Sequence, residues 1–301
     1  MPTEPTPRAL PAATARLATT GLLVLTLVNL FNYLDRWLVA ALVESLRTSE
    51  LALSDTQSGF LMTGFIVVYM VASPVFGVLG DRGRRPRLLA AGVAVWSLAT
   101  AAAGLARSYL ALLGARACVG IGEAAYGTIA PSLLSDYFPR EQRGRVMAVF
   151  FSAIPIGSAL GYIVGGYVDH HFGWRKAFFV AGVPGLLLAL LALKLWDPPR
   201  GQRDPGEPSA PPADAAKAGW RSYGDLARNR RFRLTVLGYA GYTFGIGGMA
   251  AWMPAFLERV RGVPKDVATV QFGIIVVATG FAGTFAGGWL GDRLLKRTPD
   301  G

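Results

Sequence analysis

Long apolar segments alternate with short charged connections along most of this chain. A helix needs roughly 20 residues to cross a hydrocarbon layer about 30 Å thick. Eight segments are long enough, near 17–43, 57–80, 88–106, 109–135, 146–168, 174–196, 232–257 and 268–291. The pattern therefore predicts an all-α polytopic membrane protein.

The connection at 197–231 differs from the others because it is long, rich in proline and closed by the basic run Arg228-Asn-Arg-Arg231. We read it as a cytoplasmic linker between two bundles. The chain then divides into an N-terminal tail at 1–16, a six-helix transmembrane bundle at 17–196, the linker at 197–231, and a partial second bundle of two helices at 232–301.

One charged motif occurs twice. Gly77-Val-Leu-Gly-Asp-Arg-Gly-Arg-Arg85 ends the second apolar segment, and Gly288-Trp-Leu-Gly-Asp-Arg293 ends the last one, 211 residues later. Repeated halves are typical of membrane transporters. A second half that matched the first would need about four more helices, so we expect a chain truncated at its C-terminal side.

Composition agrees with a membrane location. Hydrophobic residues make up 52% of the chain and charged residues 16%, with a mean hydropathy of +0.38. The net charge of +11 comes from clusters between apolar segments, which argues against a nucleic-acid partner. The N-terminal tail and the connections on its side of the membrane together hold 20 Lys and Arg residues, and the connections on the opposite side hold 7. The positive-inside rule then places the N terminus in the cytoplasm. We expect the membrane to be of the bacterial inner-membrane type.

The sequence offers little for enzyme chemistry. Cys118 is the single cysteine and His170 and His171 are the only histidines, so we expect neither a metal site nor a cofactor. Gly120-x-Gly-x-x-Ala125 matches a dinucleotide fingerprint but lies inside a continuous apolar segment with no strand before it. No nucleophile elbow or zinc-protease helix motif is present. We predict that the protein is not an enzyme.

At the repeated motif the chain resembles the major facilitator superfamily. The resemblance narrows to its spinster-like branch through Asn32-Tyr-Leu-Asp-Arg36, Gly120-Ile-Gly-Glu-Ala124, Ile129-Ala-Pro131 and Ala153-Ile-Pro-Ile-Gly-Ser158. It implies twelve helices in two six-helix bundles, of which this chain holds the complete N-terminal bundle and the first two helices of the C-terminal one. It also implies a central pathway for an amphiphile such as a lysolipid or sphingoid lipid, without a cofactor.

Four charged residues lie inside predicted membrane spans: Asp35, Arg36, Arg116 and Glu123. Charge in a span is costly and needs a partner or a water-filled cavity. At 1.5 Å per residue, Asp35 and Arg116 both lie roughly 10 to 12 Å below the same membrane face, whereas Glu123 lies about 21 Å deep. We therefore predict an ion pair between Asp35 and Arg116, with Glu123 on the same face of its helix as Arg116.

Two readings of this cluster stay open. In the functional one, Glu123 and Asp35 exchange protons, Arg116 holds or releases one of them, and the head group of a substrate competes for the arginine. Spinster-like carriers use the matching positions for substrate and protons, which favours this reading. In the other, the charges form a static network that orients two helices.

Further residues have predicted roles outside this cluster. The motif copies would gate the pathway through Gly77, Gly80, Asp81, Arg82, Arg85, Gly291, Asp292 and Arg293. Glycines at close spacing predict tight helix packing at Gly157, Gly161, Gly165 and Gly166. Two prolines that interrupt spans, with nearby aromatic residues, are candidates to line a cavity, namely Tyr33, Tyr126, Pro131, Pro155, Tyr242 and Trp252.

The resulting prediction is a secondary transporter that works by alternating access, coupled to protons, for an amphipathic lipid-like or organic solute. A small organic anion or a drug is the alternative substrate. A membrane fragment or scaffold that folds without transporting is the alternative function. Direction, coupling ion and oligomeric state stay open.

Overall fold

The structure is a computed structural model that describes residues 12–201, 224 and 227–295. Within these residues it contains eight long helices and no strand. They are α1 (Ala12–Thr48), α2 (Asp55–Arg82), α3 (Arg85–Ala103), α4 (Tyr109–Tyr137), α5 (Arg140–Phe172), α6 (Trp174–Leu193), α8 (Arg230–Arg261) and α9 (Lys265–Leu295). Each predicted span coincides with one helix, and most helices extend beyond the apolar segment.

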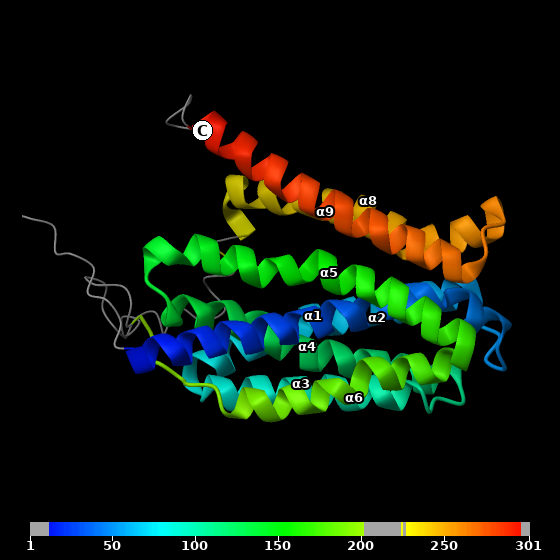
Figure 1. Ribbon diagram of the computed structural model, residues 1–301, viewed down its shortest axis with the longest axis horizontal. Helices are drawn as coiled ribbons and strands as arrows, with labels where there is room; N and C mark the ends of the chain where they lie inside the picture. The colour runs from blue at the N-terminus through cyan, green and yellow to red at the C-terminus, as the bar shows by residue number, and fades with distance from the viewer. Residues whose placement is uncertain (1–11, 202–223, 225–226, 296–301) are drawn as a thin grey trace, which may run out of the picture.

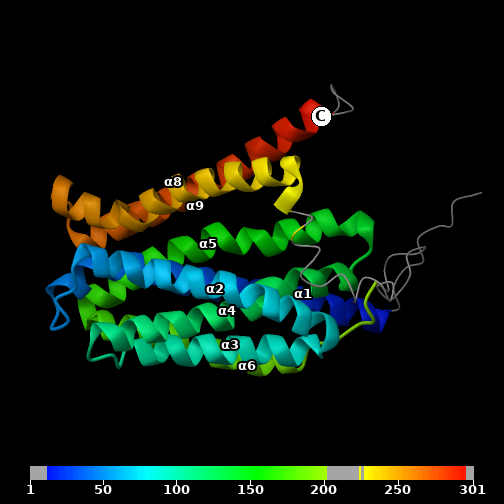
Figure 2. The same ribbon diagram turned by 180° about the vertical axis from the view of Figure 1, so that it is seen from behind.

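Helices α1 to α6 form a bundle whose axes run nearly parallel (Figure 1). In it, α1 packs on α5, α2 on α4, and α3 between α4 and α6. Helix α9 packs on α5, and α8 lies beside α1 and α9, so this pair covers one side of the bundle (Figures 1 and 2). Below, the Arg85 end is the end that holds the α2–α3 turn, and the Arg259 end is the opposite one, at the α8–α9 connection.

Local signals explain where several helices begin. The Ser54 hydroxyl accepts a hydrogen bond from the Gln57 amide, and the Gln57 side chain accepts one from the Ser54 amide, which completes a capping box at α2. Ser108 caps α4 and Asn229 caps α8 in the same way through one side-chain oxygen. These side chains satisfy amides that have no partner inside their helix.

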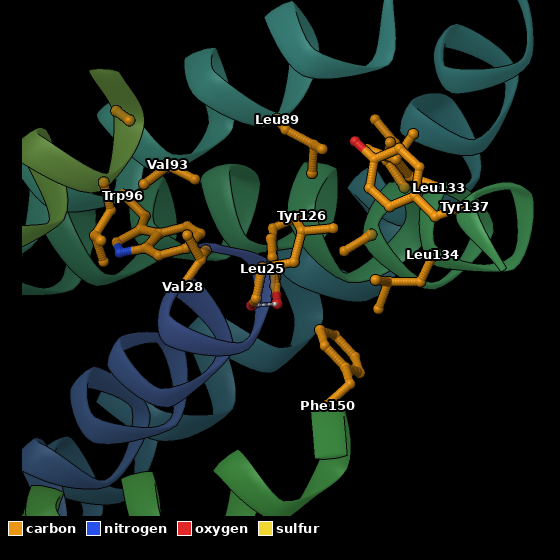
Figure 3. Close-up of a cluster of buried hydrophobic side chains, with 14 of the residues drawn as sticks. Leu25, Val28, Leu89, Val93, Trp96, Tyr126, Leu133, Leu134, Tyr137 and Phe150 are labelled. Atoms are coloured by element: carbon orange, nitrogen blue, oxygen red, sulfur yellow. Dashed lines mark hydrogen bonds between the residues drawn. The ribbon is translucent and has the colours of Figure 1, made fainter. Parts of the chain in front are cut away.

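The interior of the bundle is an apolar and aromatic cluster toward the Arg85 end. The Trp96 and Tyr126 rings meet edge to face with centroids 5.7 Å apart, and Phe150 lies beside Tyr126 (Figure 3). The Tyr126 hydroxyl donates to the Leu25 carbonyl at 2.7 Å. Tyr126, which we selected as a candidate to line a cavity, therefore lies in the core in this conformation.

Large apolar side chains are exposed on all eight helices, as expected for a membrane protein. Six helices are long and apolar enough to cross a membrane among the residues that the structure describes: α1, α2, α3, α5, α6 and α9. The other two, α4 and α8, are as long but carry more polar residues. Arg116 and Glu123 lie inside α4, and α8 is rich in glycine and tyrosine. The buried charge of α4 thus lowers the hydropathy of the helix that holds the candidate site.

Helix α5 approaches two neighbouring helices closely at its glycines. A Cβ on Gly161 would lie 2.6 Å from the Leu34 carbonyl oxygen of α1, and Gly157 and Gly165 approach α1 just as closely. Gly166 faces Thr269 of α9. Helix α5 therefore touches α1 with one small-residue face and α9 with another.

Pro131 and Pro155 were expected to interrupt their spans, but each lies inside a continuous helix. Pro131 lies inside α4 and Pro155 inside α5, and both helices continue through them. A proline removes one backbone hydrogen bond, which a helix surrounded by protein can tolerate. Pro155 contacts α9, because a Cβ on Gly280 would lie 2.9 Å from the proline Cβ.

At the Arg259 end, Arg175 of α6 ties two connections together. Its guanidinium donates to the carbonyls of Gly104 and Ala106 at 3.0 and 2.7 Å and pairs with Glu50 in the α1–α2 connection. A backbone hydrogen bond and the Arg175 guanidinium lower the pKa of the Glu50 carboxyl. Both interactions favour the charged form of Glu50, so this brace is kept at neutral pH.

Candidate functional site

The α1–α4 interface holds the four charged residues of the predicted cluster. The ion pair predicted from depth is present: Arg116 Nη1 lies 3.1 Å from Asp35 Oδ2. The Thr100 hydroxyl donates to the other Asp35 oxygen at 2.9 Å. Both charged side chains are buried, with exposed fractions of 2% and 1%. This pair is therefore closed from every side.

A second ion pair lies beside it, between Arg36 Nη2 and Glu123 Oε2 at 2.6 Å. The sequence analysis selected both residues but did not predict that they meet. Glu123 is completely buried, whereas 22% of the Arg36 side chain is exposed. Arg36, and not Arg116, is thus the arginine that is partly accessible from outside in this conformation.

Aromatic rings surround Arg36. Its guanidinium carbon lies 4.9 Å from the centroid of Tyr33, 5.2 Å from Phe65 and 5.4 Å from Tyr69. Cation–π contacts stabilise a guanidinium when its carboxylate partner is lost. The predicted place of Tyr33 at the site agrees with this arrangement. Phe65 and Tyr69 were missed, although their spacing of four residues on α2 places them on one helix face.

Several polar atoms at the site have no hydrogen-bond partner among the described residues. They include Glu123 Oε1, Arg36 Nε and Arg116 Nε. Buried polar atoms without a partner are costly, and such atoms are often found where a ligand binds. Glu123 therefore uses one oxygen for Arg36, and its other oxygen has no partner among the described residues.

A groove of about 510 Å³ leads from the Arg85 end toward this site. Tyr69, Met70, Ser73, Pro74, Gly77, Val78 and Asp81, all on α2, line it. Tyr69 thus contacts both the groove and Arg36. Most of the wall is apolar, while Asp81 marks the end of the groove that lies away from Arg36.

Two more candidates for a cavity lie on α8. Trp252 is half-buried beside α2, where a Cβ on Gly59 would lie 3.8 Å from its ring, whereas 62% of Tyr242 is exposed. In this conformation the tyrosine therefore lies on the open side of α8 rather than at the charged cluster.

The first copy of the repeated motif has two parts with different surroundings. Arg85 is buried, and its guanidinium binds Asp136 at the end of α4 and Asp197 after α6, the latter at 2.8 Å. It also donates to the Pro198 carbonyl at 2.6 Å. Asp81 and Arg82 are exposed, and neither has an ion pair within the part of the chain that the structure describes. Arg85 therefore braces one bundle, and only Asp81 and Arg82 remain for a contact with another element.

Glycines in this motif follow the same division. A Cβ on Gly80 would lie 2.9 Å from Ile129 of α4, whereas the space around Gly77 is open. Arg200 donates to the carbonyls of Gly80 and Gly83 at 2.5 and 3.0 Å. In the second copy, Gly291, Asp292 and Arg293 lie near the end of α9, and the side chain of Asp292 is outside the described residues.

Ion pairs at the Arg259 end connect α8 and α9 to the bundle. We call them the clasp. Arg259 of α8 binds both oxygens of Asp55 at 2.8 Å and also pairs with Glu44. Lys265 at the start of α9 pairs with Asp169 of α5. The sequence analysis used these residues only for the charge count, because nothing in the pattern shows which connections face each other.

At the Arg85 end the described residues form no comparable set of ion pairs with α8. From Arg230 to Tyr242 every described residue of α8 is exposed, and α9 diverges from the bundle toward its C-terminal end (Figure 1). The molecule is thus held together at the Arg259 end and separated at the Arg85 end. The groove along α2 lies at this separated end.

Comparison with known proteins agrees with the fold. The model of the Major Facilitator Superfamily matches residues 25–299. Protein spinster of Drosophila melanogaster is 36% identical over 284 residues, which cover 92% of this chain and 46% of that protein. The human protein spinster homolog 1 is 38% identical, with 92% and 55% covered. The chain therefore spans about half the length of the curated relatives it matches.

Solved structures show the same likeness. A bacterial homolog of the human lysosomal transporter spinster, in an inward-facing and unoccupied conformation, has a TM-score of 0.80 and 28% identity. The match covers 94% of this chain and 64% of that one. A D-xylose-proton symporter has a TM-score of 0.62 at 22% identity, which supports the shared fold alone.

Proposed function

Because this chain belongs to the Major Facilitator Superfamily, a family of transporters and not enzymes, we propose that it carries the pathway-forming half of a secondary transporter. Its solute is an amphiphile with an anionic head group. The single observation that carries this proposal is the Arg36–Glu123 pair, which lies next to the groove along α2 and is open on the arginine side only.

Proton coupling follows from the charges of the cluster. With both carboxylates ionised, the four residues Asp35, Arg36, Arg116 and Glu123 sum to zero. Protonation of Glu123 removes the partner of Arg36 and leaves one net positive charge beside an aromatic cage. An anionic head group then replaces the carboxylate as partner of Arg36, and the apolar groove accommodates the tail.

The two pairs divide the work in this mechanism. Asp35 and Arg116 are closed and bind each other, so they fix the distance between α1 and α4. Glu123 and Arg36 exchange partners. In this mechanism Arg36, and not Arg116 as we first expected, binds the head group. Asp35 has a structural role in this conformation.

We assign the conformation as inward-open, with the Arg85 end in the cytoplasm. Support comes from the Lys and Arg count of the connections, from the clasp at the opposite end and from the likeness to an inward-facing relative. We further propose a membrane of the bacterial inner-membrane type as the site of residence. Asp81 and Arg82, and Asp292 and Arg293, are the groups that we expect to close this end in the other conformation.

Uptake of labelled lysolipid into proteoliposomes tests the function. The chain is measured beside a form extended to twelve helices, under an imposed pH gradient and without one. We expect gradient-driven uptake by the extended form, and loss of the gradient effect in its Glu123→Gln variant. Gradient-driven uptake that persists in this variant would exclude Glu123 as the proton site. No uptake by either form would favour the scaffold reading.

The substrate class needs a separate comparison. An anionic lysolipid, a zwitterionic lysolipid and a small aromatic carboxylate compete for uptake of the labelled compound. Preference for the anionic lysolipid supports an amphiphile pathway, because both the arginine and the apolar wall are used. Equal competition by the small carboxylate would favour the organic-anion alternative.

A further inference from the structure

The start of α8 carries a dense group of arginines that the transport mechanism does not use. Arg228, Arg230, Arg231 and Arg233 occupy four of six consecutive positions, and all four are exposed. We call them the arginine collar. None of them pairs with a carboxylate among the residues that the structure describes. Two other arginines at the Arg85 end differ from them, since Arg85 and Arg200 bind carboxylate or carbonyl oxygens of the described chain.

The collar is unfavourable by itself. Four positive charges lie within about 8 Å along the chain axis, at a helix start where the macrodipole already has its positive pole. Asn229 caps the helix through its side-chain oxygen but brings no negative charge. An anion from outside the described chain would relieve this repulsion.

The neighbouring residues show where that anion comes from. Directly after the collar, Phe232, Leu234 and Leu237 are 43%, 58% and 67% exposed. These residues begin the apolar segment near 232–257, which we predict to cross the membrane. The collar therefore lies at the level of the head groups of the same leaflet.

We propose that the arginine collar is a docking surface for the head groups of anionic phospholipids. Guanidinium groups bind phosphate with paired hydrogen bonds, and each basic residue near an anionic leaflet contributes on the order of 1 kcal/mol, which is about a fivefold change in binding. The positive-inside rule explains why arginines lie on this side of the membrane. It does not predict that the lipids next to this helix are enriched in anionic head groups, which is what we propose.

The collar also has a consequence for motion. Helix α8 is held by the clasp at the Arg259 end, while the described residues of its first half are exposed at the Arg85 end. Anionic lipids that bind the collar anchor this end of α8 in its leaflet. The lipid composition of that leaflet thereby acts on an element at the open end of the molecule.

A fluorescence quenching experiment tests the collar directly. A bimane label is attached at Ala227→Cys in a Cys118→Ser background, and the protein is reconstituted in phosphatidylcholine with phosphatidylglycerol. Quenching by spin-labelled phosphatidylglycerol is compared with quenching by spin-labelled phosphatidylcholine. We expect stronger quenching by the anionic lipid than by the zwitterionic one. The difference should become smaller as the salt concentration rises from about 0.05 to about 0.5 M, because salt screens the attraction between the arginines and the phosphate groups.

Matched variants separate a lipid site from general charge. Arg230→Gln, Arg231→Gln and Arg233→Gln together should lower the preference at least about fivefold. Arg107→Gln, Lys176→Gln and Arg261→Gln remove the same charge at the Arg259 end and should leave it unchanged. The corresponding triple lysine variant should keep most of it and shows that the helix start is intact. Equal quenching by both lipids in the native protein, or an equal loss in both glutamine variants, would overturn the proposal.

Discussion

The two buried ion pairs should differ sharply in what their loss does to stability. Asp35→Asn leaves Arg116 without a counter-charge in a closed site, where 2% of its side chain is exposed and its Nε already lacks a partner among the described residues. Breaking a buried pair from one side costs about 3 to 5 kcal/mol. Glu123→Gln keeps an oxygen that accepts from Arg36, and Arg36 retains its aromatic cage and its exposed edge. We expect a loss of about 1 to 2 kcal/mol there.

Reversible unfolding in mixed micelles, followed by tryptophan fluorescence, measures this difference. Thr100→Val is the matched control for Asp35, because it removes the hydrogen bond to that carboxylate without changing any charge. It should cost about 0.5 to 1.5 kcal/mol. If Glu123→Gln destabilises the bundle as much as Asp35→Asn, the proposed division between a structural pair and an exchangeable pair is wrong.

Three further outcomes follow from the same contacts. Gly161→Ala should destabilise the bundle by about 1 to 3 kcal/mol, because α1 must move away. Gly144→Ala on the same helix has nothing within 4 Å and should stabilise the bundle by about 0.5 to 1 kcal/mol. Changes of the same sign in the free energy of unfolding of the two variants would contradict the packing. Arg85→Lys should speed hydrogen exchange at residues 196–201, since a lysine cannot reach Asp136, Asp197 and the Pro198 carbonyl together. Arg84→Lys should leave this exchange unchanged. The same exchange rate in both variants would show that the contacts of Arg85 do not hold this segment. Arg259→Glu should lengthen spin-label distances between α2 and α8 at the clasp, and a distribution unchanged from the native one would argue against the clasp.

Periodicity and length predicted most of the fold. Each apolar segment became one helix, because in lipid a helix satisfies all of its own backbone groups and sequence-local hydropathy is then enough to find it. The glycine spacing of α5 likewise predicted the close approach of a neighbouring helix, without showing which one. Helix ends were less predictable: α1 and α5 continue well past their apolar parts, where capping and contacts with other connections decide.

The site could be predicted only in part. Depth along two helices was enough to bring Asp35 and Arg116 together, because helical rise is constant. It could not predict that Arg36 meets Glu123, since neighbouring residues on α1 point in different directions and long side chains reach beyond one helical turn. The burial of Tyr126 could not be predicted for a related reason, because an aromatic residue one turn from Glu123 faces the core as easily as the pathway.

Partners far apart in the chain were beyond reach from the sequence. Arg259 and Asp55 are separated by 204 positions, and only the arrangement of α8 beside the bundle brings them into contact. The same holds for Arg85 and Asp197, which meet because the segment after α6 folds back over the α2–α3 turn. In both cases the charges were visible, but their pairing depends on tertiary structure.

Counting protons on ligand binding tests the central mechanism most directly. An anionic lysolipid is titrated into the purified protein in weakly buffered solution, and a pH indicator records the protons taken up for each molecule bound. If the head group replaces Glu123 as partner of Arg36, about one proton should be taken up per lysolipid near neutral pH, and none in the Glu123→Gln variant. Binding of the lysolipid to the native protein without proton uptake, or with the same uptake in the variant, would contradict the exchange of partners at Arg36.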